Sequence, residues 1–106
     1  MTDEPLTAER VDRVGVVTLD RPDRLNTFST ALATALDDAL VTFDDDPDVR
    51  VVVVEGAGPA FSAGIDLSEH EKHGTEAEYL DWVERMEEPF HTIARMETPV
   101  DRKSVV

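Results

Sequence analysis

Glycine, alanine and one serine make up most of the segment Gly56–Gly64, whose spacing suggests phosphate binding or nucleophilic catalysis. A dinucleotide-binding loop would need glycine where Phe61 stands, and a P-loop would need a Gly-Lys-Ser/Thr triplet that the chain lacks. A nucleophile elbow around Ser62 would need glycine at Ala60. No credible base accompanies Ser62, so the sequence argues against both kinds of phosphate loop and against a serine hydrolase.

The run Phe61–Leu67 in the same loop fits a different chemistry. It follows an apolar segment, and Ala63 and Gly64 are small enough for a ligand to approach the backbone closely. Backbone N–H groups at a helix start point outward and stabilise negative charge, which is one half of an oxyanion hole. A tight strand-to-helix connection explains the same residues equally well. Asp66 is interpreted as the cap of a helical turn rather than as an acid–base group.

The remaining polar clusters favour structural interpretations. Glu87 and Glu88 are adjacent on a predicted helix and point about 100° apart, which favours a solvated face over a carboxylate pair. His70 and His73 could share one helix face, but His91 is distant in sequence and a third ligand is missing. We therefore expect no metal site.

Composition limits the class of protein. The chain has 106 residues, 41% of them hydrophobic, with a formal net charge of −14 and no cysteine. This length allows one small domain, and the lack of cysteine excludes disulfides, thiolate metal sites and a cysteine nucleophile. The acidity argues against nucleic-acid binding, because phosphates need basic partners. The longest apolar run, Val51–Val54, is too short to span a membrane, and the acidic N-terminus does not resemble a signal peptide, so we expect a cytoplasmic protein.

The acidity is mostly carried by short side chains. Aspartate outnumbers glutamate, and lysine occurs only at Lys72 and Lys103. In molar salt the repulsion among such carboxylates is screened within about 3 Å. We interpret this pattern as that of a salt-loving host, with an ordinary acidic mesophilic protein as the alternative.

Hydrophobic patterning predicts the elements before the glycine-rich segment. Residues 1–9 are expected to be a polar lead-in, and Arg10–Asp20 is expected to form one strand, or two short strands folded around Gly15. A turn at Asp20–Asp23 should follow, because proline ends the strand. A helix capped by Ser29 or Thr30 comes next, and Asp44–Asp46 should lie in the loop beyond it. Its predicted buried face consists of Leu32, Leu36, Leu40 and Phe43.

The second half of the chain predicts a parallel sheet that is cut short. Val49–Glu55 is continuously β-branched, which is typical of a strand buried on both faces of a parallel sheet. Thr98–Val100 should be a turn into a further strand, but Asp101–Val106 does not read as one. The order of elements is that of an α/β domain, of which this chain would be the N-terminal part.

A second helix is predicted to begin at Thr75, with Glu78 completing a capping box. Pro89 should kink or split this helix. Trp82 is expected to serve helix packing or a subunit contact rather than ligand stacking, and the same is expected of Tyr79. The predicted apolar face consists of Tyr79, Val83, Met86, Phe90 and Ile93.

Three blocks of this sequence resemble the enoyl-CoA hydratase/isomerase (crotonase) family, in order and in spacing. Asp20–Thr27 (Asp-Arg-Pro-Asp-Arg-Leu-Asn-Thr) is similar to the family's Arg-Pro…Asn-Ala segment, and Asp46–Val54 is similar to its central strand. Phe61–Leu67 (Phe-Ser-Ala-Gly-Ile-Asp-Leu) resembles its Phe-Ser-Ala-Gly-Ala-Asp-Leu loop. The resemblance covers roughly residues 10–100 and is specific as a set.

The resemblance implies an α/β fold, here an incomplete crotonase-like (ClpP/crotonase) spiral of strand-strand-helix units, and assembly as a homotrimer or hexamer. It implies an acyl-CoA thioester as the substrate, no separate cofactor, and an enolate that two backbone N–H groups stabilise. By position the first N–H belongs to Ile65, and Arg24 is a further contact for a CoA phosphate. The family's contacts with the CoA arm fall on Leu25, Thr27, Ala63, Asp66 and Leu67.

The sequence departs from the family's pattern at several positions. Thr27 and Ile65 each replace a common alanine, and only the backbone of Ile65 is needed. The glycine-rich loop with the second N–H and the acid–base carboxylates would come after Val100 and are absent from these 106 residues. The reaction subclass and the length of the acyl chain are therefore undetermined.

The six residues after Val100 have a possible origin outside the gene. Asp-Arg-Lys-Ser-Val-Val can be encoded by GAT CGG AAG AGC GTC GTG, which resembles a common sequencing-adapter read. We therefore expect residues 1–100 to be the N-terminal part of a crotonase-like domain and residues 101–106 to be a non-native tail.

The alternative interpretation of the whole chain is a small acidic, non-enzymatic interaction domain or vestigial fragment whose loop matches the family by coincidence.

Overall fold

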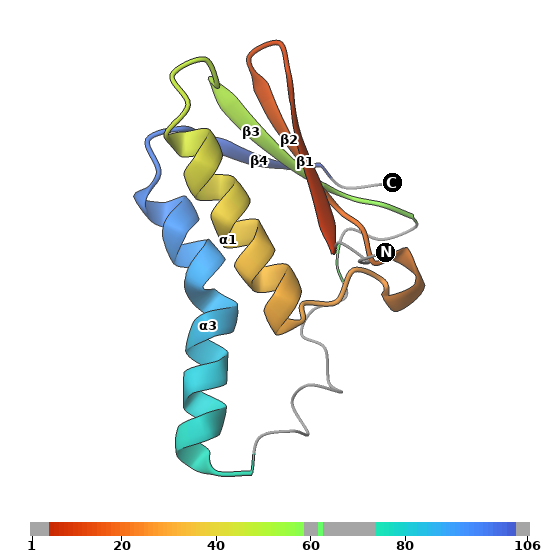
Figure 1. Ribbon diagram of the computed structural model, residues 1–106, viewed down its shortest axis with the longest axis vertical. Helices are drawn as coiled ribbons and strands as arrows, with labels where there is room; N and C mark the ends of the chain where they lie inside the picture. The colour runs from red at the N-terminus through yellow and green to blue at the C-terminus, as the bar shows by residue number, and fades with distance from the viewer. Residues whose placement is uncertain (1–4, 59–61, 63–73, 104–106) are drawn as a thin grey trace.

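The computed structural model describes residues 5–58, 62 and 74–103. None of the helices in this part of the chain is long and apolar enough to cross a membrane. Figure 1 shows a sheet, one helix that lies against it, and a second helix that packs alongside the first. The elements are β1 (Leu6–Val11), β2 (Val14–Leu19), the short 3-10 helix η1 (Pro22–Arg24), α1 (Thr30–Asp44), β3 (Val51–Gly56), α3 (Glu76–Arg95) and β4 (Val100–Lys103).

The four strands form one mixed sheet in the order β1-β2-β3-β4. β1 and β2 are antiparallel, whereas β2, β3 and β4 are parallel neighbours. Successive parallel strands are joined through α1 and then α3, and such crossovers are right-handed almost without exception. Because both crossovers step the same way across the sheet, both helices lie on the same side of it (Figure 1).

This one-sided covering corrects the expectation that β3 is buried on both faces. Val52 and Val54 are buried beneath the helices, whereas Val51 and Val53 are only half-buried. The parallel pairing with β2 is as predicted. The continuous β-branched run thus fits a strand that, within this chain, is covered on one face only. The core between sheet and helices is formed by Leu6, Val17, Leu19, Phe28, Leu32, Ala33, Leu36, Leu40, Phe43, Val49, Val52, Val54, Trp82 and Met86.

The N-terminal hairpin turns at Asp12–Arg13, not at Gly15 as the sequence pattern suggested. Asp12 takes the left-handed conformation that the tight turn requires (φ 54°), which short polar residues tolerate. Residues 6–9 belong to β1 rather than to a polar lead-in. They were missed because β1 is an edge strand, which pairs through its backbone and buries only Leu6.

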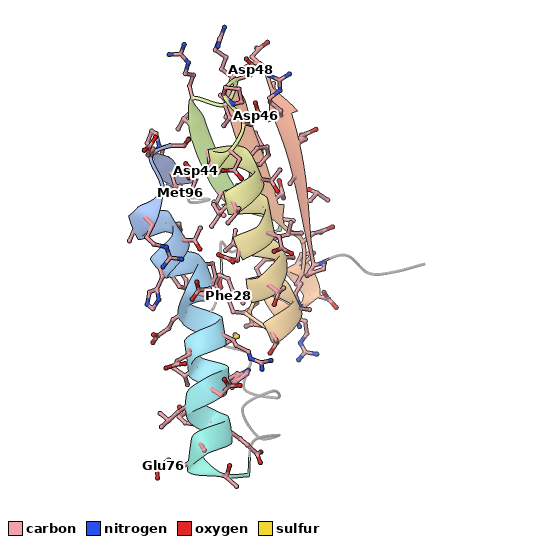
Figure 2. The ribbon with its side chains drawn as sticks, turned by 60° about the vertical axis from the view of Figure 1, so that its left-hand side comes forward. Phe28, Asp44, Asp46, Asp48, Glu76 and Met96 are labelled. Atoms are coloured by element: carbon pink, nitrogen blue, oxygen red, sulfur yellow. The ribbon has the colours of Figure 1, made fainter. Side chains whose placement is uncertain are left out.

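Helix α1 begins as predicted, with Ser29 as its cap: the Ser29 hydroxyl accepts a hydrogen bond from the N–H of Leu32, at 3.1 Å. The predicted apolar face is buried. Asp44 was predicted to lie in the loop beyond the helix, but it is the last residue of the helix, so the helix ends one residue later than predicted. Its carboxylate accepts from the N–H of Thr98 at 3.1 Å, which joins the C-terminal ends of the two helical segments (Figure 2).

Helix α3 begins at the predicted cap, where the Thr75 hydroxyl accepts from the N–H of Glu78 at 3.1 Å. Pro89 does not split it: the helix continues to Arg95 with Pro89 buried inside it. The buried face differs from the predicted one, because Phe90 is 52% exposed. The buried residues are Trp82, Met86, Pro89 and Thr92, with Tyr79, Val83 and Ile93 packed beside the core.

The strand that the sequence did not predict after Val100 is present. β4 pairs in parallel with β3, and the N–H of Val52 donates to the carbonyl of Pro99 at 2.9 Å where the pairing begins. A ladder of this kind is formed by backbone groups, so a short strand can pair without a β-branched sequence. That residues 101–106 are a non-native tail stays a prediction.

Candidate functional site

The carboxyl ends of β2 and β3 lie side by side, with Leu19 opposite Gly56 in the parallel register. The loops that leave these two strands therefore start at the same edge of the sheet. Open α/β sheets bind their ligands at this edge. The predicted binding residues follow these two strands in the sequence, Arg24–Thr27 after β2 and Ala63–Leu67 after β3.

The loop after β2 has an unusual backbone. Pro22 opens η1, where its fixed φ is suited to the first helical position. Leu25 and Asn26 follow in the left-handed region, with φ values of 52° and 53°. Such conformations cost a residue other than glycine on the order of 1–3 kcal/mol and cluster at functional sites. Two successive residues in this conformation indicate that contacts with the surrounding structure hold the backbone of this predicted CoA-contacting segment in place.

Arg21 holds this loop from inside. Its guanidinium Nη1 donates to the carbonyl of Thr27, and its backbone N–H donates to Asn26 Oδ1 at 2.7 Å. Its carbonyl accepts from the N–H of Asn26 at 2.8 Å. The side chain of Arg21 therefore stabilises the loop, whereas Arg24, three residues later, is exposed at the surface.

The loop after β3 packs directly on the loop after β2. Asn26 Nδ2 donates to the carbonyl of Ala57 at 2.9 Å, and the N–H of Ala57 donates to the carbonyl of Leu19 at 2.8 Å. Gly58 adopts a φ of +83°, and a β-carbon there would lie 2.8 Å from Pro22 Cβ. Glycine at this position lets the two loops touch.

Of the predicted site residues, the structure places Leu25 and Thr27 together on this loop, with Arg24 adjacent. Leu25 is 47% exposed and Thr27 is half-buried. The others, Ala63, Ile65, Asp66 and Leu67, lie outside the described residues. Sequence reasoning missed Asn26, which was only part of a matching block. Its signal was an asparagine next to a proline turn, since asparagine tolerates the left-handed region and offers both a donor and an acceptor.

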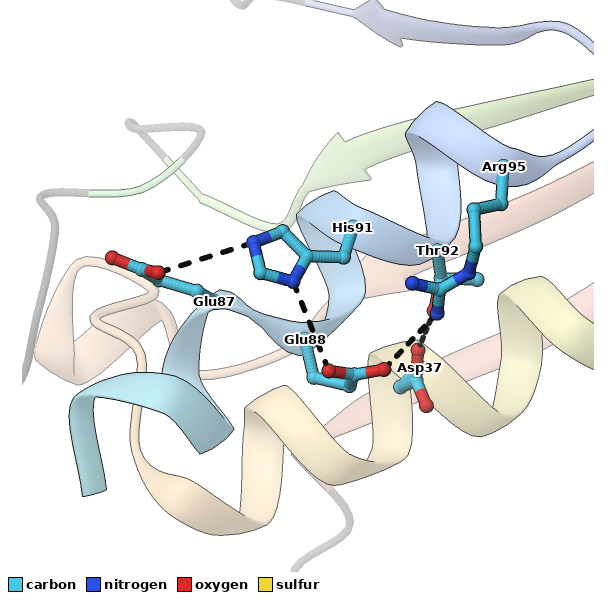
Figure 3. A network of polar contacts seen from close by, with 6 residues as sticks. All are labelled: Asp37, Glu87, Glu88, His91, Thr92 and Arg95. Carbon is cyan, nitrogen blue, oxygen red and sulfur yellow. Dashed lines mark hydrogen bonds and ion pairs between the residues drawn. The ribbon is translucent and has the colours of Figure 1, made fainter. Parts of the chain in front are cut away.

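The other candidates for chemistry lie on the exposed side of α3 (Figure 3). Glu87 and Glu88 are each 3.9 Å from a different nitrogen of His91, and Glu88 also pairs with Arg95 at 3.0 Å. All four side chains are about half exposed or more, which confirms the solvated face. Across the part of the chain that is described, no group of three or more His, Cys, Asp or Glu residues could hold a metal ion. His70 and His73 lie outside that part.

Trp82 is 3% exposed and its ring centroid lies 6.0 Å from that of Tyr79 on the same helix. This confirms its predicted role in helix packing.

A hollow between α1 and α3 is lined mainly by charged side chains, four of which are carboxylates. Such a surface repels an anion such as a CoA thioester. Its lining residues are Ala33, Thr34, Asp37, Asp81, Glu84, Arg85 and Glu88.

Comparison with known proteins decides the family. The enoyl-CoA hydratase/isomerase family model matches residues 9–100, which is most of the chain. This chain belongs to the enoyl-CoA hydratase/isomerase family. The likeness of its loop to that of the family is therefore not a coincidence, as the alternative interpretation had required.

Curated relatives of the chain carry more than one name. It is 39% identical to a probable enoyl-CoA hydratase, echA8, of Mycobacterium tuberculosis over 69 residues, which are 65% of this chain and 27% of that protein. It is 36% identical over 92 residues to the carboxymethylproline synthase of Pectobacterium carotovorum, covering 86% of this chain and 37% of that one. This enoyl-CoA hydratase/isomerase family chain thus spans well under half of either relative.

Solved structures confirm the incomplete crotonase-like fold. An enoyl-CoA hydratase/isomerase (crotonase) from Legionella pneumophila matches with a TM-score of 0.88 at 28% identity, over 97% of this chain and 40% of that one. The enoyl-CoA hydratase of Mycobacterium smegmatis matches with a TM-score of 0.86 at 34% identity, over 92% and 38%. The chain is the N-terminal part of this α/β architecture.

Proposed function

We propose that the protein to which this chain belongs binds acyl-CoA thioesters and stabilises an enolate while a proton is moved. In this proposal the intact enzyme hydrates an enoyl-CoA or shifts its double bond. The 106-residue chain supplies part of the CoA site and one oxyanion donor. This chain spans less than half of the length of its relatives. We therefore propose the activity, the assembly as a trimer or hexamer and the cytoplasmic location for the intact protein.

The observation that carries it is the joined pair of loops at the carboxyl edge of β2 and β3. Asn26 and Gly58 hold the segment Arg24–Thr27 against the start of the loop that continues to Ile65. A ligand bound across this edge would contact both loops. Together with membership of the family, this arrangement supports a CoA thioester as the ligand.

Each proposed residue has a chemical role. The backbone N–H of Ile65 would donate to the thioester oxygen as negative charge develops on it. Leu25, with its exposed side chain, offers apolar contact to the CoA arm, and Arg24 offers a positive charge to a CoA phosphate. The further proposed contacts with the CoA arm are Thr27, Ala63, Asp66 and Leu67.

The isolated chain should bind without turnover. Losing one oxyanion donor costs about 10²–10³ in rate. Losing the acid–base group costs about 10²–10⁴ more. Neither the second donor nor an acid–base carboxylate was identified in these 106 residues. The carboxymethylproline synthase among the relatives illustrates that membership of the family does not fix the reaction.

Calorimetric titration of the purified chain with butyryl-CoA tests this proposal. Saturable binding is expected, weakened at least about tenfold in Leu25→Glu, which removes apolar contact and adds a charge that repels the anionic ligand. Val41→Glu is the matched control, since Val41 is 44% exposed on α1 and Leu25 is 47% exposed. Lack of binding by the native chain, or equal losses in both variants, would contradict the proposed site. Hydration of crotonyl-CoA by this chain would contradict its proposed inactivity.

A further inference from the structure

Asn26 is fully buried, with 0% of its surface exposed, although it lies in a surface loop. A polar side chain is buried at this cost only when its hydrogen-bonding groups find partners. Its backbone is also left-handed, at φ 53°, in a loop with no glycine between Asp20 and Ser29. Asparagine tolerates this backbone conformation, so the cost that its side-chain contacts must offset is the burial of the carboxamide.

The two ends of its carboxamide bind two different loops. Oδ1 accepts from the backbone N–H of Arg21, within the loop after β2. Nδ2 donates to the carbonyl of Ala57, in the loop after β3 and 31 residues away in the sequence. The partners fix the orientation of the amide, because an N–H must face the oxygen and a carbonyl must face the nitrogen. Aspartate at this position would keep the first contact and lose the second.

The same two loops also meet at Pro22 and Gly58, where there is no room for a β-carbon. Hydrogen bonding through Asn26 and close packing at Gly58 thus act together. Residues 21–26 and residues 56–58 therefore move as one body if both contacts persist.

We propose that Asn26 is a positioning residue that holds the CoA-contacting segment Arg24–Thr27 against Ala57, at the start of the loop after β3, so that this segment meets the CoA arm in one preorganised conformation. This inference rests on the proposed function. Asn26 is fully buried, and it acts through the two loops that it joins.

Amide hydrogen exchange, measured without any ligand, tests whether Asn26 holds the two loops together. In Asn26→Asp and in Asn26→Gly, which tolerates the left-handed backbone, amides in both residues 20–28 and residues 56–58 should exchange faster than in the native chain. Thr92→Val is the control, because it removes a side-chain hydrogen bond between α3 and α1 that lies outside both loops. Faster exchange confined to residues 20–28 would overturn the inference.

Binding tests the functional consequence. Titration with butyryl-CoA should give a Kd raised about tenfold in both Asn26 variants and unchanged in Thr92→Val. If Asn26→Asp binds as tightly as the native chain while Asn26→Gly does not, the contact with Ala57 is not what matters, and the inference is wrong. If the native chain fails to bind, the proposed function fails, and the exchange result alone decides whether Asn26 locks the loops.

Discussion

The ring of Phe43 fills the space above the backbone of Gly15. Three ring atoms lie 2.8–2.9 Å from the position that a β-carbon of Gly15 would take. Gly15 sits inside β2, opposite Arg10 of β1, and not in the hairpin turn. Glycine is therefore required here for packing of α1 on the sheet, and not for a backbone turn.

Replacing Gly15 with alanine should lower the free energy of unfolding by about 1–3 kcal/mol, because the buried Phe43 ring must shift to admit a methyl group. Gly74→Ala is the matched control: nothing lies within 4 Å of a β-carbon there, so a change within about 0.5 kcal/mol is expected. Urea unfolding of the two variants measures both values. Equal free energies of unfolding for the Gly15→Ala and Gly74→Ala variants would contradict the requirement for glycine beneath the Phe43 ring.

The contact between α1 and α3 depends in part on one buried hydroxyl. Thr92 donates to the carboxylate of Asp37, and Arg95 lies close by (Figure 3). Thr92→Val keeps the shape of the side chain and should cost about 1.5 kcal/mol of unfolding free energy. Thr42→Val is the control, because the Thr42 hydroxyl is exposed and donates only within its own helix. A loss as large in Thr42→Val as in Thr92→Val would contradict this role.

The two helix caps should differ in their effect. Ser29 caps α1 next to the buried Leu32, so Ser29→Ala should lower the free energy of global unfolding by about 1 kcal/mol. Thr75 caps the end of α3 that extends past α1 (Figure 1), so Thr75→Ala should fray that turn and reduce helical circular dichroism with a smaller global loss. Thr75→Asp should retain the native signal. If Ser29→Ala and Thr75→Ala lowered the free energy of global unfolding by the same amount, the proposed difference between the two caps would be contradicted.

The sequence was sufficient for elements whose signals are local. Ser29 and Thr75 were identifiable as caps because a hydroxyl precedes each helical pattern, and the parallel β3 because of its β-branched run. The edge strand β1 and the short β4 pair through their backbones, so their side chains carry little signal. The buried face of α3 was predicted about one position off, since its orientation is set by contact with α1 and not by the helix alone.

The candidate site could be proposed from the sequence only as far as the resemblance reached. It located Leu25 and Thr27 on one loop, which the structure places at the carboxyl edge of the sheet. The bond between Asn26 and Ala57 joins residues far apart in the chain, and no pattern within either loop encodes it. Contacts of this kind depend on the register between β2 and β3.

The acidic surface predicts a dependence on salt. With a formal net charge of −14, the melting temperature should rise as potassium chloride increases from about 0.1 M to about 2 M, because screening reduces repulsion in the folded state. A variant in which three exposed carboxylates are neutralised should show a shallower rise: Asp38→Asn, Asp45→Asn and Glu97→Gln. A flat or falling melting temperature in the native chain would contradict the interpretation of a salt-loving host.

The most direct test of the central claim, that this chain is the N-terminal part of a working enoyl-CoA hydratase/isomerase, is to sequence the gene past the codon for Val100 from fresh DNA. We predict that the reading frame continues into an apolar strand, a glycine-rich loop that supplies the second N–H, and a later carboxylate. If the six residues Asp101–Val106 and a stop codon are found instead, the chain lacks the groups that the reaction needs, and the claim is contradicted.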